Sequence, residues 1–466
     1  QPGTDGALAC AVMHVLFYED LADWNYLKQY TDKPEAFKAH LKDKTPEWAA
    51  EITGLNADEI RQFARLYGKT PKSFIRLGVG FSRSRNGSHN IHAVSCLPAV
   101  SGAWQHRGGG ALLSNSGIFH TNKKLIEGLD ALDKDTRALD MSRIGPVLCN
   151  DPRDIGSGPP VKGLLIQNCN PMLVAPESNR VQQGMAREDL FICVHEQFMT
   201  ETAQMADIVL PATTFVEHND VYQTYGQMHL QAGPKIIEPP GECRSNHQVI
   251  NDLAKRLSAK HAGFEMSEEK ILEQTLNDSG YPDFDELKQS RWIDCSLPYE
   301  KAHFLDGFAW PDKKFRFQPD WIALGDTDRQ MPDFPDHWHS IDARDDDKPF
   351  RLITPPARNF LNSSFTETAT STVREKHPKA AIGRNSASEL GIIDGGLITL
   401  GNELGEVLIQ AEISDGIAPN TIVVEGIWPN HHFPGGIGIN SLISADSPAP
   451  AGGAVFHDTA VWIKKS

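Results

Sequence analysis

A repeated strand–turn–helix pattern near the middle of the chain limits the fold more than any other feature of the sequence. Apolar strands are predicted over 163–167, 190–195 and 208–210, with helical residues between the first two. The first strand runs into an Asn-Cys-Asn-Pro turn at 168–171, and the second ends in His195-Glu196. Strands that alternate with helices form a parallel sheet, whose carboxyl edge is where such sheets bind nucleotides. The pattern predicts a nucleotide site, although a pair of ordinary surface loops would contain the same residues.

The regions before and after the central pattern are predicted to contain different secondary structure. Before the central pattern, helices are predicted from residue 5, from residue 56 and over 90–103, with a strand over 73–77. After residue 348 the chain consists of short apolar runs separated by Gly, Asp and Asn turns, which is typical of a β-barrel module. The predicted barrel strands are 351–354, 397–400, 407–411, 421–424 and 460–463.

A chain of 466 residues exceeds the size at which one hydrophobic core keeps growing, so several domains are expected. The predicted fold class is α/β, with Rossmann-like nucleotide-binding layers followed by a C-terminal β-barrel. Residues 1–75 are predicted to be the remainder of a first α/β domain, and 76–265 a second α/β nucleotide-binding domain. Residues 266–347 are predicted to be a linker with small elements, and 348–466 the barrel.

Charge and hydropathy exclude two classes of partner. Forty-five Lys and Arg against 61 Asp and Glu give a net charge of -16, and we find no basic patch, so nucleic acid is not an expected partner. Mean hydropathy is -0.38, and no apolar run approaches the roughly 18 residues of a membrane span. The cysteines lack the spacing of a zinc or iron–sulfur knuckle, so buried thiols are expected at Cys10, Cys96, Cys149, Cys169, Cys193, Cys243 and Cys295.

The order of the motifs that follow the 168–171 turn is more specific than any one of them. Thr-Glu-Thr-Ala at 200–203 precedes Ala-Asp-Ile-Val-Leu-Pro-Ala at 206–212, then Glu217, then Glu-Pro-Pro-Gly-Glu at 238–242. This series resembles the second nucleotide-binding domain of molybdopterin oxidoreductases of the dimethyl sulfoxide reductase family.

The resemblance extends to both ends of the chain. Pro2 to Asp5 is similar to the motif that grips one guanosine in that family, and Asp394 to Gly405 is similar to its C-terminal barrel of the double-psi type. The likeness therefore covers nearly all of the sequence. It implies a molybdenum bis(molybdopterin guanine dinucleotide) cofactor.

The N-terminal portion of the family's proteins has no counterpart in this sequence. That portion holds the residue that ligates the metal and, where present, the cysteines of a [4Fe-4S] cluster. We therefore expect the chain to be incomplete and inactive alone. No catalytic residue and no metal ligand is assigned.

The resemblance implies three groups of cofactor-binding residues. Gly3, Thr4 and Asp5 would hold one guanine dinucleotide, with Val79 and Arg83 near the pterin, where relatives often have Met and Gln. The other guanosine would be surrounded by Asn170, His195, Glu196, His218 and Asn246, the last at a place where relatives frequently show Asp. The barrel would contribute contacts from Thr354, Arg358, Asn362, Ser363, Asn440 and His457.

The resemblance implies a two-electron oxidation or reduction of a small molecule at molybdenum or tungsten. A redox partner protein or subunit is also expected. The predicted location is the cytoplasm. Formate is disfavoured as the substrate, because Leu-Ser-Asn-Ser at 113–116 lacks the arginine that formate dehydrogenases of the family carry after a glycine-rich turn.

Two alternatives remain open. One is a non-catalytic relative, such as the large peripheral subunit of NADH-quinone oxidoreductases, which has lost the molybdenum cofactor. The other is one subunit of a split enzyme. The clusters Asp336, His337, His339 and Asp342, and His431-His432, are expected to be solvated loops rather than metal sites.

Overall fold

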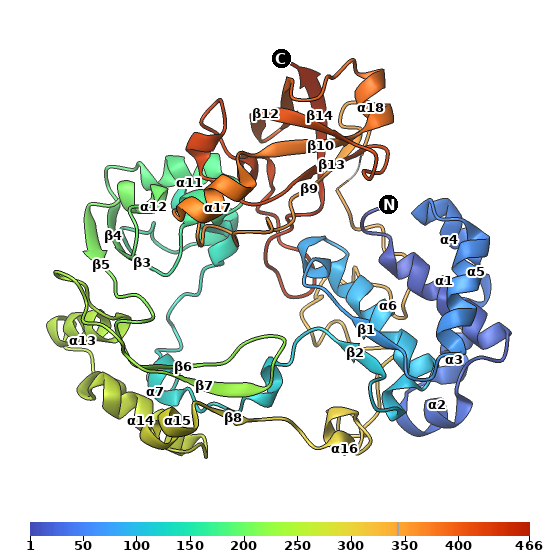
Figure 1. The fold of residues 1–466 in the computed structure, drawn as a ribbon, viewed down its shortest axis with the longest axis horizontal. Helices are drawn as coiled ribbons and strands as arrows, with labels where there is room; N and C mark the ends of the chain where they lie inside the picture. Colours follow the sequence, from blue (N-terminus) through green and yellow to red (C-terminus); the bar gives the residue numbers. More distant parts are fainter. Residues whose placement is uncertain (343) are drawn as a thin grey trace.

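The structure, a computed structural model, describes residues 1–342 and 344–466. Four hydrophobic cores hold it together, and Figure 1 shows the four packed units that contain them: the N-terminal helices in blue, a parallel sheet in green, an antiparallel sheet in yellow-green and a barrel in orange and red. The sequence prediction of α/β layers followed by a barrel is confirmed. None of the helices in the described chain combines the length and apolarity that a bilayer crossing requires.

The first unit is built around α1 (Asp5–Tyr18), which is buried on nearly all sides. Its sequence has apolar residues around the whole circumference, which is the composition of a central helix. Helices α4 (Pro46–Thr53), α5 (Ala57–Gly68) and α6 (Gly87–Val100) surround it. The unit also contains α2 (Trp24–Tyr30), α3 (Pro34–His40) and a parallel pair of strands, β1 (Phe74–Arg76) and β2 (Gly110–Leu112).

The second unit is the predicted parallel sheet, in the order β3 (Gly163–Gln167), β4 (Phe191–Glu196) and β5 (Ile208–Pro211). Helices α10 (Pro171–Val174), α11 (Ser178–Met185) and α12 (Glu201–Gln204) connect the strands. The register pairs Gln167 with His195 and Glu196 with Pro211. All three strands therefore end at one edge of the sheet.

The third unit is an antiparallel sheet of β6 (Asp220–Tyr222), β7 (His229–Gly233) and β8 (Trp292–Asp294), which the sequence did not indicate. It packs with α14 (Glu268–Asp278) and α15 (Phe284–Ser290), and α13 (Asn246–Leu257) lies in the chain between β7 and α14. The chain then returns to the first unit, where Phe317 stacks on Phe37 with ring centroids 4.4 Å apart. Much of 266–347 is thus packed on neighbouring units.

The fourth unit is a closed barrel with the strand order β10-β12-β11-β14-β9-β13. Five of its strands match predicted ones: β9 (Phe350–Ile353), β11 (Leu397–Asn402), β12 (Gly405–Ser414), β13 (Thr421–Val424) and β14 (Thr459–Lys465). The sixth, β10 (Lys379–Gly383), was not predicted, because Lys-Ala-Ala-Ile-Gly has little β preference. Helices α17 (Ala369–Glu375) and α18 (Arg384–Glu389) flank it.

A buried ion pair inside the barrel also contacts the first unit through Arg85. Arg351 of β9 donates to the Asp458 carboxylate, and both side chains are almost fully buried. The same carboxylate accepts the backbone N–H of Arg85 at 3.1 Å and that of Asp342 at 2.9 Å. Burial lowers the pKa of the Arg351 guanidinium, and the Asp458 charge opposes that shift. Asp458 therefore connects the barrel, the segment before β9 and the loop before α6.

Asp458→Asn should destabilise the protein. The amide keeps the shape but removes the charge, and breaking a buried pair by removing one partner costs about 3 to 5 kcal/mol. Urea and thermal unfolding should both shift clearly. Asp415→Asn is the matched control, because Asp415 pairs with Arg384 on the barrel surface, where both side chains are exposed. Equal shifts for the two variants would show that the buried pair has no special weight.

A second polar cluster lies where the 315–341 segment covers α6. His89 is fully buried and accepts the backbone N–H of Asp336 at 2.9 Å. Burial and the neighbouring His92 lower the pKa of His89 from 6.5 to about 3, and burial lowers the pKa of His92 to about 4. Both rings are held neutral in the folded protein.

Because these buried histidines resist protonation, we expect the folded protein to lose stability in acid. The unfolded chain takes up a proton on His89 near pH 6.5, whereas the folded chain does so only near pH 3. Stability is therefore fully present above pH 6.5 and falls as the pH drops, by up to roughly 1.4 kcal/mol per pH unit for one group. His89→Gln should flatten urea unfolding midpoints between pH 6.5 and 4, while the exposed His431→Gln should not. An unchanged pH dependence in His89→Gln would contradict this account.

Candidate functional site

A cavity of about 720 Å³ lies at the carboxyl edge of the parallel sheet. Asn168 follows β3, Gln197 follows β4 and Thr213 follows β5, and all three line the cavity. His218 and Asn246, two residues predicted to surround a guanosine, line it as well. The strand ends and these two residues thus line one cavity.

Two of the predicted residues in this cavity, His218 and Asn246, have hydrogen-bonding groups that face no close partner within the described chain. The Nδ1 atom of His218 is 3.0 Å from the Thr213 hydroxyl, which leaves Nε2 3.9 Å from the Asp220 carboxylate. Asn246 is the first residue of α13, and its exposed side chain has no hydrogen-bond partner among the described residues. Ser245 caps the helix, so the Asn246 amide is available to a ligand.

Three other residues predicted for this guanosine are engaged within the protein. Asn170 accepts from the Thr202 hydroxyl at 2.6 Å and donates to Glu201 at 3.3 Å. His195 is 1% exposed, and its two ring nitrogens are 3.0 Å from the Gln167 amide and the Arg244 carbonyl. Glu196 accepts the N–H of Gln197 at 2.7 Å. These side chains hold the strand ends in place.

The residues predicted to bind the first guanosine lie at the start of α1. Gly3 has φ +77°, a conformation that favours glycine, and its carbonyl accepts from Asn86 at 2.7 Å. Thr4 donates its hydroxyl to the Gln1 carbonyl at 2.6 Å, so it does not cap the helix with its side chain. Asp5 is the first residue of α1. Desolvation raises the pKa of its carboxyl, although part of the side chain is exposed.

Arg83 lies in the segment before α6 and is next to His457 of the barrel. The backbone N–H of His457 donates to the Arg83 carbonyl at 2.8 Å. Burial lowers the pKa of His457, and its Nδ1 atom is buried with no partner among the described residues. Arg83 also lines a mainly apolar cavity of about 520 Å³, together with Cys169 and Phe456. His457 does not itself line that cavity, although its neighbour Phe456 does, and an unpaired buried nitrogen is unusual in a folded protein.

The predicted barrel contacts fall in two places. Thr354 donates to the Phe456 carbonyl at 2.8 Å, and the loop beyond it leaves Arg358 and Asn362 exposed and Ser363 half-buried. Asn440 is 2% exposed and donates to the Leu173 carbonyl of α10 at 2.9 Å. Asn440 therefore joins the barrel to the parallel sheet.

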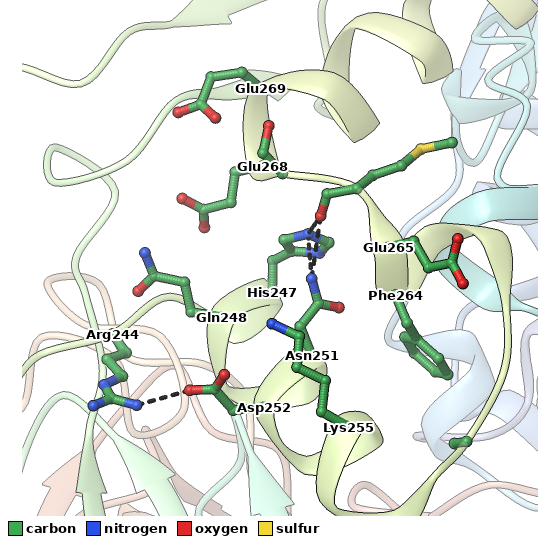
Figure 2. Close-up of a pocket in the computed structure, with 13 residues that line it drawn as sticks. Arg244, His247, Gln248, Asn251, Asp252, Lys255, Phe264, Glu265, Glu268 and Glu269 are labelled. Carbon is green, nitrogen blue, oxygen red and sulfur yellow. Dashed lines mark hydrogen bonds and ion pairs between the residues drawn. The ribbon is translucent and has the colours of Figure 1, made fainter.

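A second cavity, of about 820 Å³, adjoins the first and contains none of the residues predicted from sequence. Figure 2 shows its lining from α13 and the start of α14, with Arg244 paired to Asp252 at 2.9 Å. The ring of His247 bonds the Met266 carbonyl at 2.9 Å, which ties α13 to the turn before α14. His247 and Glu268 line both cavities.

No three His, Cys, Asp or Glu side chains gather as metal ligands within residues 1–342 and 344–466. The two clusters expected to be solvated loops therefore do not form such a group. All seven cysteines are free thiols. Cys10 and Cys96 are buried as predicted, whereas the other five are partly exposed, so for those five the prediction of burial is wrong.

Two family models match the chain. Residues 1–256 match the molybdopterin oxidoreductase family, and residues 350–460 match the molydopterin dinucleotide binding domain.

Several named proteins are similar in sequence. The probable oxidoreductase YoaE of Bacillus subtilis is 34% identical over all of this chain and 67% of its own length. The dimethyl sulfoxide/trimethylamine N-oxide reductase of Cereibacter sphaeroides is 26% identical over 92% of this chain and 58% of its own. The F420-dependent formate dehydrogenase alpha subunit of Methanocaldococcus jannaschii is 25% identical over 90% of this chain and 63% of its own.

A solved structure shares the fold. Acetylene hydratase from Pelobacter acetylenicus superposes with a TM-score of 0.78 and 19% identity, over all of this chain and 70% of that one. The family models, the relatives and the closed barrel agree with the motif order at 168–242. This chain belongs to the molybdopterin oxidoreductase family, of the dimethyl sulfoxide reductase type.

Proposed function

We propose that the chain holds a molybdenum or tungsten bis(molybdopterin guanine dinucleotide) cofactor for the two-electron oxidation or reduction of a small substrate. The observation that carries this proposal is the cavity at the carboxyl edge of β3, β4 and β5, with the side chains of His218 and Asn246 in its lining. Such an edge is where open α/β sheets bind nucleotides. Its volume of about 720 Å³ is within the range of small-molecule sites.

The candidate residues suit a long polar ligand with two guanine ends. One end would be held by Gly3 and Asp5, and the other by His218 and Asn246. In the barrel, His457 has an unpaired buried nitrogen and is bonded to the Arg83 carbonyl through its backbone. Each buried polar atom of a ligand left without a partner costs roughly 1 to 3 kcal/mol, so a cofactor of this kind needs many such groups.

When bound, the cofactor supplies the two-electron exchange at its metal. The residues of this chain bind and orient it. The barrel loop with Arg358, Asn362 and Ser363 would cover the pterins and exclude water. Within the described residues the proposal places no iron–sulfur cluster, because the cysteines do not gather there. Electrons would pass to a redox partner protein or subunit.

We further propose that formate is disfavoured as the substrate, although a relative is named a formate dehydrogenase subunit. The 113–116 segment has no arginine of its own. The nearby Arg76 donates to the carbonyls of Leu112 and Leu113 at 3.0 and 2.6 Å, so its guanidinium is engaged by the backbone. A carboxylate substrate would lack a free cation at this place.

Nucleotide analysis tests the cofactor directly. Acid extraction of the protein, produced in cells that synthesise the cofactor, should release GMP at about two per metal ion, because each dinucleotide ends in guanosine monophosphate. Mass spectrometry and metal analysis of the same sample measure the ratio. Protein from cells blocked in cofactor synthesis is the control. Recovery of no guanine nucleotide from the first sample would favour the non-catalytic relative.

The Asp5→Asn variant tests whether Asp5 binds the first guanine. Asparagine replaces one acceptor oxygen by an NH₂ donor, which would oppose a guanine donor and leave it unpaired, at a cost of roughly 1 to 3 kcal/mol in binding. Cofactor occupancy at limiting supply should fall, while the Tm of the cofactor-free protein stays nearly unchanged. Asp20→Asn, at an exposed turn after the same helix, is the matched control. Unchanged occupancy with a lower cofactor-free Tm would assign Asp5 to helix stability alone.

A further inference from the structure

We propose that Glu268, the first residue of α14, determines the base specificity of the cavity at the carboxyl edge of the sheet by accepting hydrogen bonds from the guanine edge. This inference rests on the proposed function and deepens it. Helix α14 belongs to the third unit, outside the parallel sheet, yet Glu268 lines the same cavity as His218 and Asn246.

The chemistry of guanine requires two acceptors. Its Watson–Crick edge presents N1–H and the N2 amino group as neighbouring parallel donors. A carboxylate offers two oxygens in matching geometry, whereas the amide of Asn246 offers one oxygen and a donor that would oppose the second. A cavity that reads guanine by this edge therefore needs a carboxylate that is free to bind it.

Glu268 meets this requirement better than the other two carboxylates that line the cavity. Glu127 is 3.7 Å from the Lys123 ammonium, and Asp220 is 3.9 Å from His218. Among the described residues, no ion-pair or hydrogen-bond partner contacts the Glu268 carboxylate. Ser267 fixes the start of α14 by accepting the N–H of Lys270 at 3.3 Å, which places Glu268 in the first turn.

A second residue of α14 independently points to a ligand. Thr275 is 3% exposed, lines the same cavity, and its hydroxyl oxygen is buried with no partner among the described residues. It follows Glu268 by two helical turns, so the two side chains share one face of α14. Buried hydroxyl groups nearly always have a partner, so an unpaired one beside a cavity indicates a group that is supplied from outside.

The neighbouring cavity supplies a matched control. Figure 2 shows Glu268 and Glu269 adjacent at the start of α14, near the His247 ring. Glu268 lines both cavities, whereas Glu269 lines only the second one. Both are in the first turn of the same helix, so their replacement by glutamine has similar effects on the helix dipole.

The test is calorimetric titration of the purified chain with GMP and with IMP, which lacks the 2-amino group. Titrations are made in the Asp5→Asn background, so that the other proposed guanine site does not contribute. The parent chain should bind GMP about tenfold or more tightly than IMP, because IMP leaves one acceptor unpaired. Glu268→Gln should weaken GMP binding by a similar factor and abolish the preference. Glu269→Gln should change neither, and circular dichroism should show the same fold for all variants.

Thr275→Val and Thr275→Ser form a second pair. Valine keeps the shape without the hydroxyl and should weaken the binding of both nucleotides, whereas serine should retain it. Full retention of GMP preference in Glu268→Gln would overturn the inference and leave the proposed function standing. Equal binding of GMP and IMP by the parent chain would also overturn the inference without contradicting the proposed function. Absence of binding to either nucleotide would count against the guanine site itself, and so against the proposed function.

Discussion

The buried pairing of Asp458 with Arg351 is the interaction on which the arrangement of the candidate site most depends. The Asp458 carboxylate contacts β9, the backbone at Arg85 and the backbone at Asp342 at the same time. Charges removed from water are costly unless each finds a partner, so this cluster tolerates few alternative arrangements. It fixes His457 beside the loop that carries Arg83. The start of α1, where we propose that one guanine binds, and the barrel are thereby held in a fixed relation.

The barrel is tied to the parallel sheet by a different set of polar contacts. Asn440 donates to the Leu173 carbonyl, and the buried carboxylate of Glu177 accepts the N–H of Ala445 at 2.9 Å. Glu201 accepts the N–H of Asn430 at 3.2 Å. The barrel is therefore attached both to the first unit and to the parallel sheet, the two places where we propose that guanine binds. The division at residues 75, 265 and 347 remains our proposal for the domains.

The fold was largely predictable where local signals were strong, and less so elsewhere. Periodicity and turn residues located the strands of the parallel sheet and five of the six barrel strands. Strand β10 was not predicted because its small residues show no β preference. Strands β6 to β8 were not predicted because they are short, and β8 pairs with β7 across about 60 residues of chain. In the site, Asn168, Gln197 and Thr213 follow directly from the rule that strand ends line the cavity. Glu268 and Thr275 do not, because only tertiary packing brings α14 to that edge.

The central claim is that a guanine dinucleotide occupies the cavity at the carboxyl edge of the parallel sheet, where that edge faces the third unit. A crystal structure of the protein isolated with its cofactor tests this most directly. The account predicts guanine density in the cavity lined by His218 and Asn246, with the pterins beside Arg83 and His457. A structure with the metal present and this cavity filled only by water, or with guanine density bound elsewhere, would contradict it.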